Sequence, residues 1–255
     1  MPGFETLSLA LIAWIALVIL LAGVIQGALG LGFPTLATPL IALATDIRTA
    51  IIVVLLPCLA SVLLNAFKGI PLRQVLARFW MMPLYMVLGA WLGTRIFIAY
   101  PEFPFTLLLA GAILIYLNLD RLGRTDWPIV QAHEKTFGFV FGTIAGVSEG
   151  ATNVAAPALI VFYLAVGVQP TLLVQALNIC FVTGKTTQFI TFAAVGGVSA
   201  TQWLATLPLA LVAIAGSLYG IRIRDRIDAA TYRRWLRGAL FAIAFILCVQ
   251  YLYAP

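Results

Sequence analysis

Two ionisable side chains, those of Glu149 and Lys185, lie within otherwise apolar stretches of the region from Gly142 to Gln188. An ionisable group in hydrocarbon costs about 2.5 to 3.5 kcal/mol on insertion scales, so such a residue usually faces a polar cavity that serves a function. We expect the two to share one cavity, in which the Lys185 ammonium binds an anion and Glu149 takes up a proton as the anion binds. The alternative is that they form a buried ion pair with a structural role.

The run from Thr171 to Phe192 predicts a helix with one polar face. Its polar residues Gln175, Asn178, Lys185 and Gln188 are separated by three, seven and three positions. At 3.6 residues per turn, these intervals place the four side chains in one stripe. At a shift of 122 residues the first half of the chain carries apolar residues instead. Only the second half is therefore expected to supply a polar helix face to the site.

Two interruptions rich in small residues break the apolar pattern, one over residues 26–32 and the other over residues 148–153. Each is followed by a predicted helix start, at Pro34 and near Asn153. Helix N-termini carry unpaired N–H groups and a partial positive charge, so they favour carboxylate, sulfonate or phosphate oxygens. In inverted repeats two such ends can converge near the membrane midplane. The residues predicted to bind the anion are Gly30, Gly32, Phe33, Thr35, Ser148, Gly150, Thr152, Asn153, Asn178, Lys185 and Gln188, with Glu149 as the proton-coupling residue.

The composition is typical of a polytopic membrane protein. Of the 255 residues, 63% are hydrophobic and 9% are charged, with a mean hydropathy of +1.07, whereas soluble domains contain about 25% charged residues. The net charge of +6 comes from basic residues in short loops, where they orient helices, so a nucleic-acid partner is not supported. The expected partners are the lipid bilayer and a small anionic substrate.

The expected fold class is all-α, and hydropathy alone counts about eight spans of the roughly 20 residues that cross a bilayer. The first window, Leu7 to Gly23, is interpreted as a retained helix because residues 1–6 contain no Lys or Arg to form the basic start of a signal peptide. The segment from Phe33 to Ala44 is too short to cross comfortably. Further spans of the first half are expected over Ala50 to Phe67, Phe79 to Ile98 and Phe105 to Leu119.

The second half of the sequence repeats the first. Glycines expected to allow close helix packing recur at a shift of 127 residues, namely Gly89, Gly93, Gly216 and Gly220. Further upstream, a shift of 118 residues pairs Gly32 with Gly150 and Pro39 with Pro157. These shifts predict one integral domain made of a first membrane repeat over residues 1–119, an inter-repeat loop over 120–135 and a second repeat over 136–255.

Loop charges indicate how the repeats are oriented, because Lys and Arg concentrate in cytoplasmic loops. A basic loop containing Arg73 precedes the Gly89 helix, whereas the basic loop of the second half, containing Arg226, follows the Gly216 helix. The repeats are therefore predicted to be inverted, with about five helical segments each and Gly-rich broken helices near the midplane. Arg73 and Arg226 would face the cytoplasm, with both termini outside. We expect the location to be the bacterial inner membrane.

The duplicated break ending in proline, from Gly27 to Pro39 and from Gly146 to Pro157, resembles the TauE/SafE family of anion permeases over nearly the whole chain. That family includes sulfite, sulfonate and sulfoacetate transporters. The resemblance implies a substrate among small sulfur-containing anions such as sulfite or organosulfonates. The sequence departs from the family pattern at residues 149–153, which are usually richer in glycine, and at Lys185, where small residues are common.

The rival hypothesis is an intramembrane serine hydrolase, because residues 146–150 satisfy the short G-x-S-x-G pattern with Ser148 as nucleophile. No strand is expected before Ser148, and the only histidine, His133, lies in the polar connection, so the base would have to be Lys185. No cofactor motif or metal-ligand spacing is present, and the three cysteines lie in apolar runs. The sequence therefore favours a secondary permease rather than an enzyme, acting by uniport or by proton coupling.

Overall fold

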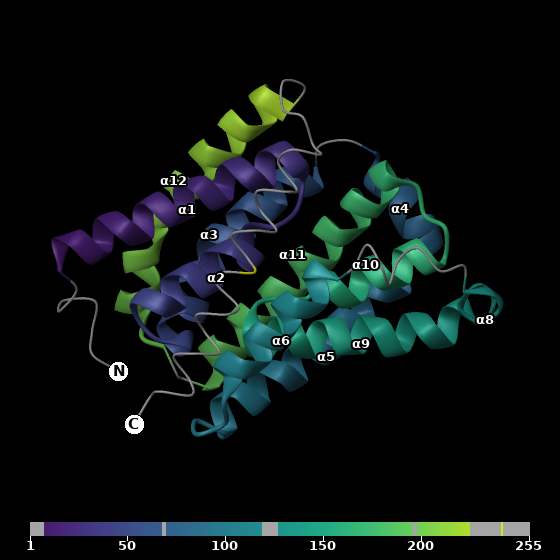
Figure 1. The fold of residues 1–255 in the computed structure, drawn as a ribbon, viewed down its shortest axis with the longest axis horizontal. Coiled ribbons are helices and arrows are strands. Elements are labelled where there is room, and N and C mark those ends of the chain that lie inside the picture. Colours follow the sequence, from purple (N-terminus) through teal and green to yellow (C-terminus); the bar gives the residue numbers. More distant parts are fainter. Residues whose placement is uncertain (1–7, 68–69, 119–126, 196–197, 225–240, 242–255) are drawn as a thin grey trace.

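The computed structural model describes residues 8–67, 70–118, 127–195, 198–224 and 241. Within these residues the chain forms helices and no strand, as the sequence predicts (Figure 1). In chain order the helices are α1 (Leu9–Leu29), α2 (Phe33–Ala44), α3 (Ile47–Ala66), α4 (Leu72–Phe79), α5 (Met81–Ala99), α6 (Phe105–Leu117), α8 (Pro128–Ala132), α9 (Glu134–Thr152), α10 (Ala156–Ala165), α11 (Pro170–Val195) and α12 (Ala200–Ile223).

Four of the described helices, α1, α3, α5 and α12, are long and apolar enough to cross a membrane. The helices α2, α6 and α10 are apolar but shorter. The longest described helix is α11, with 26 residues, and it carries the predicted polar stripe. The fold is therefore that of a polytopic membrane protein in which short helices accompany full-length ones.

The first break begins later than predicted, because residues 26–29 belong to helix α1, whereas the predicted helix start at Pro34 is confirmed. Helix α1 ends at Leu29, and Gly30 caps it in the left-handed conformation with φ 76°, donating its N–H to Gln26 O at 2.7 Å. Gly32, with φ 107°, precedes α2, and Pro34 occupies the first turn of that helix. The positive φ angles on either side of Leu31 explain why this turn uses glycine, which has no Cβ to oppose them.

The second break begins later than predicted. Residues 148–152 belong to helix α9, and only Asn153 leaves it, with φ 64° and its N–H donated to Glu149 O. The prediction that Ser148, Glu149, Gly150 and Thr152 interrupt the helix is therefore wrong. The small residues there serve packing instead, because a Cβ on Gly150 would lie 2.5 Å from both Ala90 O and the Thr94 nitrogen of α5. Asparagine tolerates the left-handed conformation, so it ends α9 where glycine ends α1.

The two breaks correspond at a shift of 123 residues. Gly30 and Asn153 are both left-handed caps, and Pro34 and Pro157 both lie in the first turn of the following helix. The shift of 118 residues inferred from the sequence, which pairs Pro39 with Pro157, is therefore wrong for this region. Pro39 lies inside α2, where it marks no helix start.

Glycines join the two halves by reciprocal helix packing, as expected for the small residues of α5 and α12. A Cβ on Gly216 of α12 would meet Leu20 O of α1 at 2.5 Å, and a Cβ on Gly89 of α5 would overlap Thr143 O of α9. Gly89 and Gly216 are 127 residues apart, and Leu20 and Thr143 are 123 apart. Each half thus packs its first long helix, α1 or α9, against the helix of the other half that carries the repeated glycines, α12 or α5.

The directions of these helices follow from the same contacts. Along α9 and α5, Gly146 contacts Gly89 and Gly150 contacts Gly93, so these two helices run parallel. Helices α1 and α12 are parallel by the same pattern, with Gly23 against Gly216 and Gly27 against Ser217.

The equivalent helices α3 and α11, by contrast, run antiparallel. Gln175 near the start of α11 donates to Ala66 O at the end of α3. At the other end, Asn153 bonds both Ile51 O near the start of α3 and Lys185 in the second half of α11. Because these equivalent helices run in opposite directions, the two repeats are related by a rotation about an axis perpendicular to the helices rather than parallel to them.

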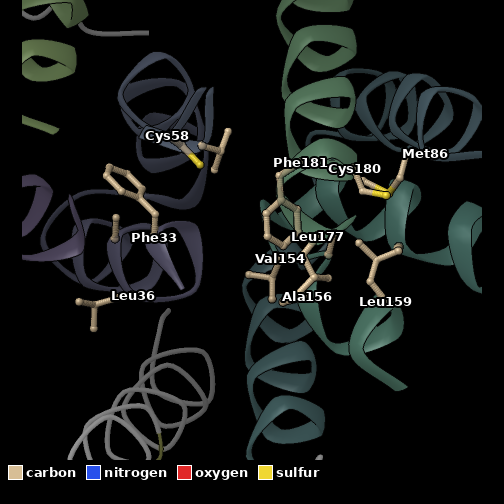
Figure 2. Packing of buried hydrophobic residues seen from close by; sticks show 14 of the residues in the cluster. Phe33, Leu36, Cys58, Met86, Val154, Ala156, Leu159, Leu177, Cys180 and Phe181 are labelled. Atoms are coloured by element: carbon tan, nitrogen blue, oxygen red, sulfur yellow. The ribbon is translucent and has the colours of Figure 1, made fainter. Parts of the chain in front are cut away.

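The apolar core surrounds the second break. Figure 2 shows Leu177 and Phe181 of α11 beside Val154 and Ala156, and all of these residues are buried in one cluster. This packing fixes the position of α10 against α11. Cys58 and Cys180 are buried free thiols, in agreement with a packing role, whereas Cys248 lies outside the described residues.

The glycine packing yields a stability prediction. Replacing Gly89 with Ala should destabilise the protein by about 1–3 kcal/mol, because the added methyl group overlaps the α9 backbone and a backbone cannot move aside cheaply. Gly111→Ala is the matched control, since a Cβ there would meet nothing within 4 Å and alanine is the better helix former. Thermal unfolding of the purified protein in detergent should therefore separate the two variants. Equal losses would contradict the packing role.

Candidate functional site

Lys185 lies at the centre of a buried polar network at the second break. Its Nζ atom is 2.8 Å from Glu149 Oε1, and both side chains are 0% exposed. The same ammonium donates to Asn153 Oδ1 at 2.6 Å and to Gln188 Oε1 at 3.2 Å. Its three N–H directions therefore each have an oxygen acceptor, which is what a buried ammonium requires.

The carboxylate of Glu149 also occupies the start of helix α10. Its Oε2 atom accepts the N–H of Ala155, the residue before α10, at 3.1 Å. Its Oε1 atom makes no further hydrogen bond within the described residues beyond its contact with Lys185. A helix N-terminus and an ammonium, the two groups predicted to hold an anion, thus converge on one carboxylate.

Amide side chains tie this network to the surrounding helices. Gln188 donates to the backbone oxygens of Glu149 and Gly150 and to Asn153 Oδ1, at 3.0–3.3 Å. Asn153 in turn donates to Thr38 Oγ1 of α2 and to the backbone oxygen of Ile51 in α3, both at 3.3 Å. The second break is therefore held by α11 on one side and by the first half of the chain on the other.

The first break has its own network, built around a residue that the sequence did not single out. Gln26 accepts the Phe33 N–H, at the start of α2, through Oε1 at 3.2 Å. Its Nε2 donates to Gly30 O at 3.1 Å and to Asn178 Oδ1 at 2.9 Å, and Asn178 Nδ2 donates to Gly30 O at 2.7 Å. The signal that could have found Gln26 is its position four residues before Gly30, the same offset that separates Glu149 from Asn153.

Helix α11 connects the two networks. Asn178 reaches the first break and Lys185 the second, and seven residues at 1.5 Å per residue place them about 10 Å apart along the helix. The predicted stripe thus contacts one partner set at each break, with the apolar Phe181 between them on the same helix face. Gln175, one turn earlier, instead bonds the end of α3.

Thr35 has an unused polar group close to these breaks. The residue is buried, and its Oγ1 has no hydrogen-bond partner within the described part of the chain. It lies one turn before Thr38 on the same face of α2, and Thr38 is the residue that contacts Asn153. Thr35 therefore has a free hydroxyl on the α2 face that meets the second break.

The remaining predicted residues lie outside the two networks. Thr152 Oγ1 donates to Ser148 O within α9, at 2.8 Å. Ser148 itself is a partly exposed helical residue, and among the described residues Lys185 bonds Glu149, Asn153 and Gln188 rather than its hydroxyl. The structure therefore does not bring Ser148 and Lys185 together as a nucleophile and base.

Two further features of the described residues bear on the site. No group of three or more His, Cys, Asp or Glu side chains is placed to hold a metal ion there. A cavity of about 360 Å³ lies beside α4, α5 and α9, lined by Arg78, Trp80, Lys135 and others, and none of its lining residues belongs to either network. Lys185, Glu149, Asn153 and Gln188 are all fully buried, so the network at the second break is closed to solvent.

A family comparison covers this whole arrangement. The family described as sulfite exporter TauE/SafE matches residues 15–247, a range that contains both breaks and the polar face of α11. No curated protein and no solved structure matches the chain. The family is one of membrane transporters of sulfite and related sulfur anions, in agreement with the apolar helices. The chain belongs to the TauE/SafE sulfite exporter family.

Proposed function

We propose that this protein is a secondary permease for a small sulfur-containing anion, such as sulfite or an organosulfonate, and that the anion binds at the helix breaks with Lys185. The observation that carries the proposal is a buried oxyanion, the Glu149 carboxylate, held at once by Lys185 Nζ at 2.8 Å and by the Ala155 N–H at 3.1 Å. Sulfite and sulfonates present oxygens of the same kind to the same donors.

The surrounding groups suit such a substrate. Asn153 and Gln188 add neutral hydrogen-bonding groups beside the charged ones. Thr35, whose hydroxyl has no partner among the described residues, lies one turn from Thr38, which contacts Asn153. A site with several donors at different angles fits an anion whose oxygens surround a central sulfur atom. Because these donors are shielded from water, each interaction with a charged oxygen is stronger than it would be at a surface.

Transport requires the closed site to open to each side in turn, and inverted repeats provide two equivalent half-structures for doing so. The antiparallel pair α3 and α11 and the parallel pairs α1 with α12 and α5 with α9 support this arrangement. Glu149 is the proposed proton-coupling residue, since it is the acidic group in contact with Lys185. The protein has no proposed cofactor.

The charge of Lys185 leads to the first test of this proposal. Lys185→Met should weaken binding of sulfite by about 10- to 100-fold, the equivalent of one charge-assisted hydrogen bond lost from a buried site. Binding to purified protein and uptake into proteoliposomes would be measured together. Because Lys185→Met leaves Glu149 buried without its partner, the double variant Lys185→Met/Glu149→Gln controls for misfolding. Wild-type affinity in a folded variant would show that Lys185 is structural.

Membrane orientation gives a second test. The segment with Arg73, predicted as a loop, forms the short helix α4 before α5, and Thr201 lies at the start of α12. With inverted repeats, these two positions lie on opposite sides of the membrane. Single cysteines replacing exposed Arg73 and Thr201, in a chain whose native cysteines are replaced, should react differently in intact cells. An impermeant reagent should label position 201 from outside and position 73 only after lysis. Labelling of both from one side would contradict the inversion. The predicted positions of Arg226 and of both termini lie outside the described residues.

The serine hydrolase remains the alternative function, and Ser148→Ala distinguishes it. In the permease, Ser148 contributes only a partly exposed hydroxyl of α9, so the variant should retain anion uptake within a factor of a few. In a hydrolase, the loss of the nucleophile would abolish cleavage of ester or peptide substrates. Cleavage by the wild type that disappears in Ser148→Ala would overturn the permease proposal.

A further inference from the structure

Gln26 and Glu149 occupy equivalent positions at the two breaks. Each lies four residues before a left-handed cap, and each accepts a backbone N–H near the start of the next helix, Phe33 at 3.2 Å for Gln26 and Ala155 at 3.1 Å for Glu149. The two side chains have nearly the same shape and differ in charge. The protein thus contains a neutral and an ionisable version of one structural feature.

The partners on α11 differ in the same way. Gln26 meets the neutral amide of Asn178, and every hydrogen bond of that pair joins neutral groups. Glu149 meets the ammonium of Lys185. The buried thiol of Cys58 on α3 also lies within electrostatic range of both Lys185 and Glu149. Arg224 also reaches the first break, where its guanidinium donates to Gly27 O and Ala28 O at the end of α1. Among the described residues, however, the second break is the one at which a cation contacts the side chain that accepts an N–H at the start of the next helix.

We propose that Glu149 is a tethered competitor of the transported anion, because the Glu149 carboxylate occupies the place where the anion binds. The anion replaces this carboxylate at the second break only. This inference rests on the proposed permease function and deepens it. The substrate displaces the Glu149 carboxylate from the ammonium of Lys185 and from the Ala155 N–H before α10. Gln26 has no charge to gain or lose, so it remains the permanent cap of α2.

Charge balance determines what happens to Glu149 during the exchange. Before exchange, the ammonium of Lys185 is neutralised by the carboxylate, and after exchange it is neutralised by the anion. A displaced carboxylate that stayed ionised would be a buried charge without a partner, which is strongly unfavourable. Glu149 therefore leaves as the neutral acid, and one proton is taken up for each anion bound. Binding is then tighter at lower pH.

Chemical rescue tests where the anion binds. In Glu149→Ala the carboxylate is removed and Lys185 is left without its counterion, so sodium formate should occupy the gap and raise the thermal unfolding temperature of the purified variant. Sodium chloride at the same concentration controls for ionic strength. The matched variant is Gln26→Ala, which opens the equivalent gap beside neutral partners and should show no rescue by formate. The wild type should show none either, because its site is filled.

Absence of formate rescue in folded Glu149→Ala, or equal rescue in Gln26→Ala, would overturn the inference. These results do not involve sulfur anions, so they leave the permease proposal standing. Conversely, rescue by formate in a protein that transports neither sulfite nor any sulfonate would contradict the permease function, while showing that an anion can replace the Glu149 carboxylate beside Lys185.

Glu149→Gln provides the second measurement and keeps the test decisive if the alanine variant does not fold, since glutamine has nearly the same shape as glutamate and occupies the equivalent position, 26, at the first break. Removing the competing carboxylate should tighten binding of methanesulfonate by about 10- to 100-fold at neutral pH. This factor is expected if the wild-type state in which Glu149 has left Lys185, the state able to bind the anion, is populated at only a few per cent. Affinity should rise as pH falls in the wild type and stay flat in the variant. Weaker binding by folded Glu149→Gln, or an unchanged pH profile, would refute the competition.

Discussion

The constraint on which the rest of this structure depends is the burial of one ammonium group. Lys185 cannot lie inside a membrane helix without partners, and its position is made possible by three oxygens within 3.2 Å. Two of those oxygens come from α9 and its cap, so α9 must end beside α11. Asn153 makes this possible, because its left-handed backbone turns the chain while its side chain faces the lysine. A purely apolar α11 would impose no such requirement.

The position of α9 depends in turn on the glycines that face α5. A helix that must deliver Glu149 and Asn153 to one point needs a rigid support, and Gly146 and Gly150 allow the α5 backbone to approach within contact distance. Gly184 of α11 serves the same purpose nearer the site, since a Cβ there would lie 3.2 Å from Glu149 Cγ. Small residues in this fold therefore control distances between charged groups, although they carry no polar side-chain atoms of their own.

Much of this organisation is predictable from the sequence, and the failures have physical causes. The end of the first break was placed correctly because glycine and proline restrict the backbone in characteristic ways at Gly32 and Pro34, although residues 26–29, predicted to belong to the break, continue helix α1. The second was placed too early because serine, glycine and threonine also occur inside packed helices, and α9 uses them that way. Gln26 was missed because an uncharged amide in an apolar run gives a weak signal. Its importance depends on contacts with Phe33 and Asn178 that only the fold brings together. The pairing of Glu149 with Lys185, considered from the sequence as a structural alternative, is present.

The reciprocal packing of α1 on α12 and α9 on α5 has a consequence for symmetry. Each half packs its first long helix on the glycine-bearing helix of the other half. This reciprocal arrangement is the contact pattern of an antiparallel homodimer. In a homodimer of identical halves, every feature of one break would have to recur at the other, and two lysines would face two carboxylates. Joining the halves in one chain removes that obligation. Gln26 with Asn178 and Glu149 with Lys185 can differ because a single polypeptide encodes each of them once.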